Sequence, residues 1–304
     1  MILFIFVDGM GIRSKKENNP FFAENLPVLR KLLFEEAEPV DPVMGIKGVP
    51  QSATGQTSIF TGLNASAING SHKEGFPNKL LKKLLKEKSI FKYLRDNNKK
   101  FTFANGYIID NLEILKKSRF LSATSYMTIE IEKKVRGLDK IIKGKAVYHD
   151  ITNLSLIDRK ENKFLKKIEK FIPEYEAYYN KNLLEKIPLI TPSDGAHNLL
   201  EISGKNDFTL FEYFKTDMIG HKKDEDKALE VLSDLEEFFK TLLDNFHFNK
   251  DTLILVSDHG NIEDLSIPGH TKNPVPLFIS GYKEEMFQNI SYIYDLAHKI
   301  KEYY

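Results

Sequence analysis

Runs of apolar residues are the clearest structural signal in this sequence. Ile2 to Val7 and Thr252 to Val256 are almost wholly apolar, and each run ends in a short polar segment. Continuous apolar runs of this length are typical of central strands of a parallel sheet, which are buried on both faces. Three further stretches predict additional strands: Phe101 to Ile109, Asp207 to Phe214 and Pro274 to Ser280.

Apolar residues recur at helical spacing between these strands. This pattern predicts amphipathic helices, and a further helix is expected from Gln56 to Thr61, with Ser52 close to its N-terminus. Strands that alternate with helices predict an α/β fold, a three-layer α/β/α core with a mostly parallel sheet. The amphipathic helices are predicted at Leu80 to Lys88, Ser89 to Asn98 (with Ser89 as N-cap), Ser193 to Ile202, Asp224 to Phe246 and Ser291 to Tyr304.

The alternation of strands and helices stops in the middle of the chain. Between Asn111 and Lys186 the sequence is rich in lysine, with helical pieces such as Asn162 to Phe171, and the strand signal is weak. We therefore expect an inserted cap domain at 111–186, between a first part of the core at 1–110 and a second part at 187–304.

Composition limits the class of partner. Hydrophobic residues make up 41% of the 304 residues, enough for one large core, and the net charge is only +1. A balanced charge gives no overall attraction to nucleic acid or to an anionic membrane, so neither is an expected partner. The apolar N-terminus stops after seven residues, too short to span a bilayer, and we expect a cytoplasmic protein. Nothing in the sequence indicates an oligomeric state.

Acidic residues and histidines follow the predicted strands. Three strands lead to an aspartate, and the chain has no cysteine, so any metal site must use oxygen and imidazole ligands. Such mixed ligands favour Zn²⁺ or Mn²⁺, and two ions about 3.5–4 Å apart can clamp both oxygens of a phosphoryl transfer. The candidate residues are Asp8, Ser52, Asp217, His221, Asp258, His259 and His270.

Each candidate also has an ordinary explanation when it is taken alone. Ser52 is placed as a helix N-cap would be, and Asp8 before Gly9 is a common turn. Asp217 and His221 have a spacing that occurs by chance in many helices and loops. The ordered combination of all seven residues is therefore what predicts two metal ions beside a serine nucleophile.

The ordered motifs resemble those of the alkaline phosphatase superfamily. The pattern is closest to the metalloenzyme core of cofactor-independent phosphoglycerate mutase and phosphopentomutase, and it includes both ends of the chain but not its middle. The motifs are Val7-Asp8-Gly9, Gln51-Ser-Ala-Thr-Gly55, Thr216-Asp-Met-Ile-Gly-His221, Ser257-Asp-His-Gly-Asn261 with Glu263, and His270-Thr-Lys-Asn-Pro-Val-Pro276.

The resemblance implies an alkaline-phosphatase-like core and a role for each matched residue. It implies one metal ion held by Asp8, Ser52, Asp258 and His259, and a second held by Asp217, His221 and His270. Ser52 would carry the phosphoryl group of a small phosphorylated metabolite, with a phosphatase or phosphomutase outcome. The alternatives are a phosphodiesterase or phosphonate-cleaving hydrolase of the same superfamily, and a non-catalytic metal-binding protein.

The substrate side of the site is less defined by the motifs. The related mutases have asparagine and histidine where this chain has Gln51 and Gln56, and they have a much larger second domain, so their substrate is not transferred. The alternative for His72 is a solvated loop position, and the alternative for His149 is a hydrogen bond within the cap. Lys47 and Lys272 lie near the motifs, but their charge alone does not decide whether they bind phosphate. The substrate candidates are Gln51, Lys47, His72, Asn105, His149 and Lys272.

Overall fold

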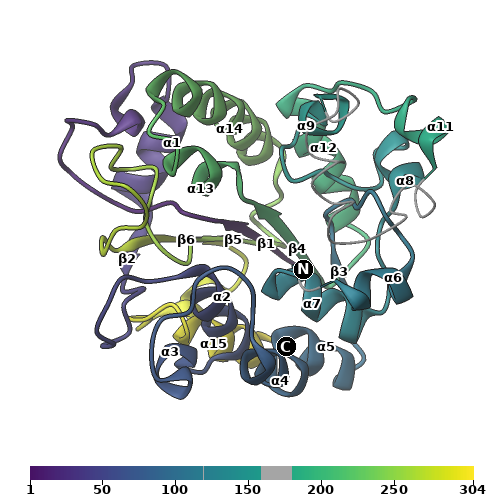
Figure 1. The fold of residues 1–304 in the computed structure, drawn as a ribbon, viewed down its shortest axis with the longest axis horizontal. Coiled ribbons are helices and arrows are strands. Elements are labelled where there is room, and N and C mark those ends of the chain that lie inside the picture. The colour runs from purple at the N-terminus through teal and green to yellow at the C-terminus, as the bar shows by residue number, and fades with distance from the viewer. Residues whose placement is uncertain (119, 159–179) are drawn as a thin grey trace.

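The computed structural model describes residues 1–118, 120–158 and 180–304. The described residues form a six-stranded sheet with helices on both faces (Figure 1), which confirms the predicted α/β/α layers. The strands are β1 (Ile2–Val7), β2 (Glu38–Val40), β3 (Phe101–Phe103), β4 (Phe208–Tyr213), β5 (Thr252–Val256) and β6 (Val275–Gly281).

The first strand lies in the middle of the sheet. The order is β2-β6-β5-β1-β4-β3, and β1 pairs in parallel with both β4 and β5. The pair β3–β4 is also parallel, whereas β6 is antiparallel to both β5 and β2. The sheet is therefore mostly parallel, and the carboxyl ends of β1, β4 and β5 meet at one edge.

Alternate residues of β1 contribute to the two cores on either side of the sheet. Leu3, Ile5 and Val7 pack in one hydrophobic cluster, whereas Phe4 and Phe6 pack in the other. Every residue of β1 is fully buried, so neither face tolerates a polar side chain. This explains why an unbroken apolar run predicts the strand.

The helices divide between the two faces as Figure 1 shows. One face is covered by α1 (Pro27–Lys31), α12 (Pro192–Ser203) and α14 (Glu225–Asn245), and α13 (Lys215–Gly220) contacts α14. The other face is covered by α2 (Ser52–Thr61), α4 (Lys79–Lys88), α5 (Ile90–Asp96) and α15 (Asp295–Tyr303), with α3 (Ala65–Asn69) beside α2.

Side-chain caps determine where several of these helices begin. The Thr191 side chain accepts from the backbone of Asp194, and the Asp194 carboxylate accepts from Thr191 in return, so α12 has a complete capping box. Asp224 caps α14 by accepting from the backbone N–H of Lys227, and Ser89 caps α5 as predicted. The predicted helices at Ser89 to Asn98 and Asp224 to Phe246 are therefore confirmed within two residues at each end.

The middle of the chain contributes short helices beside β3. A separate hydrophobic cluster lies between Ile109 and Ile187, although Ala123 and Met127 pack on the core of the sheet. The predicted helix at Asn162 to Phe171 lies outside the described residues, and the division at 111 and 186 stays a prediction. The helices here are α6 (Leu112–Lys117), α7 (Ala123–Met127), α8 (Leu138–Ile142), α9 (Leu154–Asp158) and α11 (Lys181–Leu184).

Two predicted elements are shorter than expected. The strand at Phe101 to Ile109 ends at Phe103, because the side chain of Asn105 replaces the next backbone pairing with β4. Its amide donates to the Glu212 carbonyl at 2.7 Å and its oxygen accepts from the Glu212 N–H at 2.9 Å. The closing helix begins only at Asp295, whose carboxylate accepts from the backbone of Ser291 and Tyr292.

The apolar N-terminus has the buried role that its sequence predicts. It forms the central strand β1 and not a helix. Within the described ranges, no helix combines the length and the apolar character that crossing a membrane requires.

Replacing Asn105 with alanine tests its structural role. We expect Asn105→Ala to lower the free energy of unfolding by about 2–4 kcal/mol, because a buried N–H and a buried C=O of Glu212 lose their partner. Urea denaturation measures this change, with Asn245→Ala on the exposed end of α14 as the control. If Asn105→Ala left the free energy of unfolding unchanged but impaired turnover of a phosphate ester, the result would favour a substrate contact for Asn105 instead.

Candidate metal centre

Three aspartates lie at the same edge of the sheet. Asp8 directly follows β1, Asp258 lies two residues after β5, and Asp217 is in α13, which follows β4. Because β1 pairs in parallel with both β4 and β5, the ends of these strands are neighbours. The sheet therefore brings together three carboxylates that are far apart in sequence.

The serine candidate is the first residue of α2. Gln51 is the N-cap residue, and the Ser52 hydroxyl points to His259, whose Nε2 is 3.0 Å from the Ser52 Oγ. The backbone of α2 approaches Asp258 so closely that a Cβ at Gly55 would lie 2.9 Å from the Asp258 Cβ. Gly55 is thus required for the close approach of the helix to this carboxylate.

Oxygen atoms from three residues gather around one nitrogen of His259. Its Nε2 lies 3.2 Å from Asp8 Oδ1, 3.6 Å from Asp258 Oδ2 and 3.0 Å from Ser52 Oγ. The Nδ1 of the same ring faces the Gly260 carbonyl at 3.4 Å. Asp8, Asp258 and His259 therefore form one group with the spacing of metal ligands.

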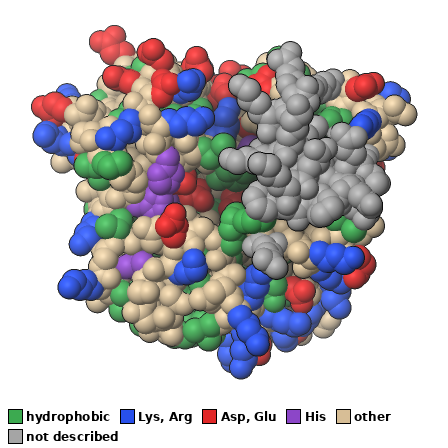
Figure 2. Space-filling view, viewed as in Figure 1, with side chains coloured by type: hydrophobic (Ala, Val, Ile, Leu, Met, Phe, Trp, Pro, Cys, Tyr) green, Lys and Arg blue, Asp and Glu red, His purple; other side chains and the backbone are tan. Residues whose placement is uncertain are grey.

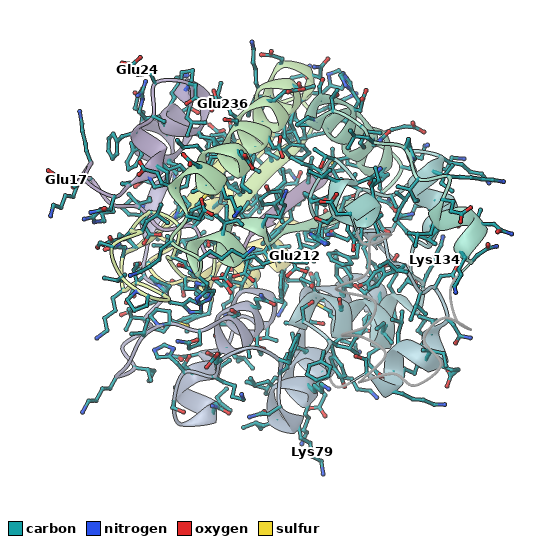
Figure 3. All side chains as sticks on the ribbon, turned by 45° about the horizontal axis from the view of Figure 1, so that its top comes forward. Glu17, Glu24, Lys79, Lys134, Glu212 and Glu236 are labelled. Atoms are coloured by element: carbon teal, nitrogen blue, oxygen red, sulfur yellow. The ribbon has the colours of Figure 1, made fainter. Side chains whose placement is uncertain are left out.

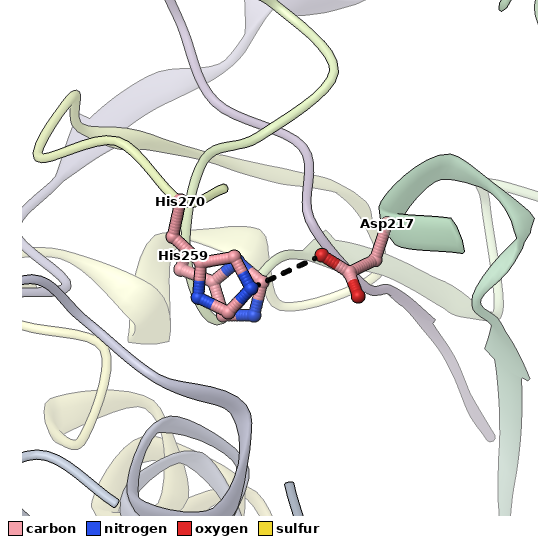
Figure 4. Close-up of side chains that lie close together, drawn as sticks. All are labelled: Asp217, His259 and His270. Atoms are coloured by element: carbon pink, nitrogen blue, oxygen red, sulfur yellow. Dashed lines mark ion pairs between the residues drawn. The ribbon is translucent and has the colours of Figure 1, made fainter. Parts of the chain in front are cut away.

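A second group lies beside the first. The two carboxylate oxygens of Asp217 lie 3.4 Å from His221 Nε2 and 3.3 Å from His270 Nε2, and the two Nε2 atoms are 3.2 Å apart. Figure 4 shows Asp217 and His270 with His259, whose ring stacks on that of His270 at 3.6 Å. All seven predicted residues converge, although their roles as ligands stay predictions.

The orientation of His270 is suited to metal binding. Its Nδ1 lies 3.0 Å from the Pro50 carbonyl, which can only accept a hydrogen bond, so the proton belongs on Nδ1. Nε2 faces Asp217, where it donates to the carboxylate when it carries a proton and can offer a lone pair to a metal ion when it does not. A second hydrogen bond of this kind is what orients histidine ligands in metal sites.

Asp258 supplies the test of whether a cation fits here. Its side chain is fully buried, and neither carboxylate oxygen has a hydrogen-bond partner among the described residues. An isolated buried carboxylate is strongly unfavourable unless it is paired with a positive charge or a metal ion. Both oxygens of Asp258 therefore fit a divalent cation held together with Asp8 and His259.

The pKa values of the protein without cations also indicate that these carboxylates require positive charge. Burial raises the pKa of the Asp258 carboxyl well above its ordinary value, and the charge of Asp8 adds to the rise. Burial alone would lower the pKa of His259, but the carboxylates of Asp258 and Asp8 raise it to about 10. Burial also opposes the charge of Asp217, whose pKa is nevertheless held well below its usual range by hydrogen bonds with His221 and His270. Without cations, protons supply the positive charge that the carboxylates require.

Buried polar residues hold the loop that carries His259 and His270. Glu263 accepts hydrogen bonds from the backbone N–H groups of Gly11 at 3.0 Å and Asn261 at 2.7 Å, and from the side chains of Thr271 and Asn273. Asn261 in turn donates to Asp217 Oδ1 at 2.7 Å. These bonds connect the loop to β1 and to α13, so both groups of ligands are positioned by one network.

The substrate candidates do not gather in one place. Asn105 and His149 line the cavity described below, and the polar atoms of Asn105 are bonded to the Glu212 backbone. His72 is held by the Ser66 hydroxyl and faces the Ile46 carbonyl, and burial together with the nearby Lys272 lowers its pKa. Lys47 and Lys272 are exposed, and Gln51 precedes Ser52; none of these three is a lining residue.

A cavity of about 680 Å³ opens beside the two groups of ligands. Asp8, Ser52 and Asp217 line the end beside these groups, which we call the inner end, and most of the other lining residues come from 103–149 and 212–218. Figure 2 shows histidine and acidic side chains next to hydrophobic ones at a hollow on this face. The size is that of a pocket for a small ligand.

The sequence analysis did not identify Glu212 as part of the site. This residue lies in the interior (Figure 3), lines the cavity, and accepts a hydrogen bond from the Thr124 hydroxyl at 2.5 Å. Burial raises its pKa to about 8, with a contribution from the charge of Asp8. The available signal was an acidic residue within the otherwise apolar run Phe208–Tyr213.

Comparison with known proteins identifies a family. The sequence model of the family described as the Metalloenzyme superfamily matches residues 1–297. Two curated relatives are 2,3-bisphosphoglycerate-independent phosphoglycerate mutases. That of Mycoplasma genitalium is 32% identical over 111 residues, or 34% of this chain, and that of Ehrlichia canis is 27% identical over 105 residues, or 32% of this chain. The matches cover only 22% and 21% of the two mutases.

Solved structures share the fold over the whole chain. The alkaline phosphatase of the Antarctic bacterium TAB5 superposes with a TM-score of 0.54 at 14% identity, covering 99% of this chain and 97% of that one. A cold-active alkaline phosphatase of Shewanella sp. gives 0.54 at 13% identity, covering 100% and 99%. These likenesses establish the predicted alkaline-phosphatase-like fold.

Metal content tests the ligand role of Asp258. We expect the protein purified with Mn²⁺ or Zn²⁺ to hold about two ions per chain, and Asp258→Asn to lose at least one of them, because an amide cannot supply the negative charge. Elemental analysis measures the content, and Asp244→Asn on the exposed face of α14 is the control. Full metal content in Asp258→Asn would exclude this carboxylate as a ligand.

Proposed function

Because the chain belongs to the Metalloenzyme superfamily, we propose that it is a phosphoryl-transfer enzyme with two divalent metal ions and Ser52 as nucleophile. Its substrate is a small phosphate ester, and no nucleic acid or membrane takes part. The reaction proceeds through a phosphoserine, which is then resolved by water or by a second hydroxyl.

The observation that carries this proposal is the gathering of three oxygen atoms around His259 Nε2. In a serine hydrolase triad, the histidine uses one nitrogen for the serine and the other for the carboxylate. Here Ser52, Asp8 and Asp258 all face the same nitrogen, and the other nitrogen faces a carbonyl. The arrangement therefore suits a shared cation and does not suit a proton relay.

The residues of the chain can hold both ions. Asp8, Ser52, Asp258 and His259 would hold one ion, and Asp217, His221 and His270 would hold the other. His259 also lies within ligand spacing of Asp217 and His270, so the two groups adjoin at this ring. These mixed nitrogen and oxygen ligands favour Mn²⁺ or Zn²⁺. When bound, the two ions lower the pKa of the serine hydroxyl and neutralise charge on the phosphate.

In the proposed reaction, Ser52 attacks the phosphorus atom of the ester. The Ser52 hydroxyl loses its proton to solvent as its Oγ forms a bond to phosphorus. The bond between phosphorus and the alcohol oxygen breaks, and the alcohol leaves after taking up a proton from solvent. The N-terminus of α2 faces the same region, and its partial positive charge stabilises negative charge on the serine oxygen. Attack by water then releases inorganic phosphate and restores the hydroxyl, whereas attack by a second substrate hydroxyl gives a mutase.

Substitution of the nucleophile is the direct test of the mechanism. We expect Ser52→Ala to lower kcat for p-nitrophenyl phosphate by more than about 10³-fold, because the Ser52 hydroxyl is the one that lies with Asp8 and Asp258 around His259 Nε2. Metal content should stay near that of the wild type, since Asp8, Asp258 and His259 remain.

Thr54→Ala is the matched control for that variant, because Thr54 lies on the same turn of α2 and its hydroxyl bonds only to backbone groups. An active Ser52→Ala together with an inactive Thr54→Ala would place the nucleophile at Thr54. Full activity of the wild type after chelation would remove the metal ions from the mechanism.

A comparison of ester classes separates the proposed reaction from its alternatives. We expect a phosphate monoester to be cleaved faster than a diester or a phosphonate ester, because a monoester carries two negative charges that two cations can neutralise. Rates for p-nitrophenyl phosphate, bis-p-nitrophenyl phosphate and p-nitrophenyl phenylphosphonate measure this. A faster diester or phosphonate would assign the chain to that alternative, and no turnover of any of them would favour a metal-binding protein without catalysis.

A further inference from the structure

The cavity beside the metal centre has two chemically different ends. Its inner end contains the charged and nucleophilic side chains of Asp8, Ser52 and Asp217. The rest of the wall also contains polar side chains such as Asn105, Ser122 and Glu212, but most of its exposed surface is apolar. The apolar and aromatic lining residues include Phe103, Tyr107, Ile108, Ile109, Leu115, Tyr148 and Phe214. A molecule that reaches Ser52 through this cavity must therefore place its remaining part against hydrophobic side chains.

Three exposed hydrophobic side chains lie at the wall of the same cavity. Phe76, Phe120 and Met218 are 41%, 45% and 46% exposed, and all three line it. The rings of Phe76 and Phe120 are in edge-to-face contact, with centroids 5.3 Å apart. Single exposed hydrophobic residues need no explanation, but a group of them beside a cavity indicates a binding surface.

Positive charge is missing from the described part of this wall. None of its described lining residues is lysine or arginine, and the acidic groups Asp8, Asp217 and Glu212 all lie there. Among the described lining residues, a second anionic group, such as the carboxylate of a phosphoglycerate, finds no lysine or arginine to pair with, and burial against these residues is costly. The phosphate itself is different, because metal ions at the inner end neutralise it.

We propose that the substrate is a phosphate monoester of a hydrophobic alcohol, with its phosphate at Ser52 and its aliphatic or aromatic part in this cavity. The inference rests on the proposed phosphoryl transfer and specifies its substrate class. In the reaction, the Ser52 hydroxyl gives its proton to solvent and its Oγ–phosphorus bond forms, while the bond between phosphorus and the alcohol oxygen breaks and the alcohol takes up a proton from solvent. Water then hydrolyses the phosphoserine to inorganic phosphate.

A series of n-alkyl phosphates tests the cavity without changing the chemistry. Ethyl, butyl and hexyl phosphate have leaving groups of nearly equal basicity, so differences in kcat/KM report binding of the chain. We expect kcat/KM of the metal-loaded enzyme to rise by up to about fourfold for each methylene buried, and 3-phosphoglycerate to be a poor substrate. A flat series, or a preference for 3-phosphoglycerate, would overturn the inference.

The variant Phe76→Ser tests whether the dependence of kcat/KM on chain length arises from the cavity wall. Phe76 is partly exposed, so its replacement should leave the fold intact, and we expect the ratio of kcat/KM for hexyl over ethyl phosphate to fall at least about threefold. Tyr282→Ser is the matched control, because Tyr282 is 47% exposed and is not a lining residue. An unchanged ratio in Phe76→Ser, or an equal fall in both variants, would contradict the placement of the alcohol.

Binding to the inactive enzyme separates this inference from the proposed reaction. Calorimetric titration of metal-loaded Ser52→Ala should give tighter binding for hexyl than for ethyl phosphate. Tighter binding with no turnover by the wild type would uphold the cavity assignment and reject the phosphoryl transfer. Turnover of phosphate esters with binding independent of chain length would uphold the transfer and reject the cavity assignment.

Discussion

The buried carboxylate of Asp258 is the constraint on which the site depends. It has no hydrogen-bond partner among the described residues, and the neighbouring Asp8 adds a second negative charge. Burial of such a pair is tolerated only when positive charge is present. The parallel pairing of β1 with β5 brings the two acids together, and Glu263 holds the loop that follows them. The sheet and this loop therefore hold two acids together at a point where cations or protons must balance their charge.

Central strands could be predicted because burial on both faces leaves a simple signature. The apolar runs Ile2–Val7 and Thr252–Val256 match β1 and β5 residue for residue. The strand expected from Phe101 to Ile109 failed after Phe103, because a side-chain amide at Asn105 takes over the pairing. This side-chain pairing depends on the backbone of Glu212, which is far away in sequence. The local sequence around Asn105 therefore does not predict it.

The predicted ligand set converged for a related reason. Strand ends determine where Asp8 and Asp258 lie, so their proximity follows from sheet order once the strands are recognised. Substrate residues follow no such rule. His72 was a candidate for its nearness to Ser52 in sequence, yet it is bonded to Ser66 and does not line the cavity. Glu212 was missed because its role depends on segments packed against it from elsewhere in the chain.

A site with charge at one end and hydrophobic walls distinguishes some features of a ligand more strongly than others. Each buried methylene changes binding by only about 0.8 kcal/mol, so apolar walls distinguish weakly among alcohols of similar size. Against the described lining residues, a second anionic group would be disfavoured more strongly, since it would lose its hydration and meet no lysine or arginine there. Under the proposed function, the cavity would therefore define a class of esters and not a single compound. Its walls come largely from segments that follow β3, outside the strand ends that carry the ligands, so they can differ between proteins that share the same metal centre.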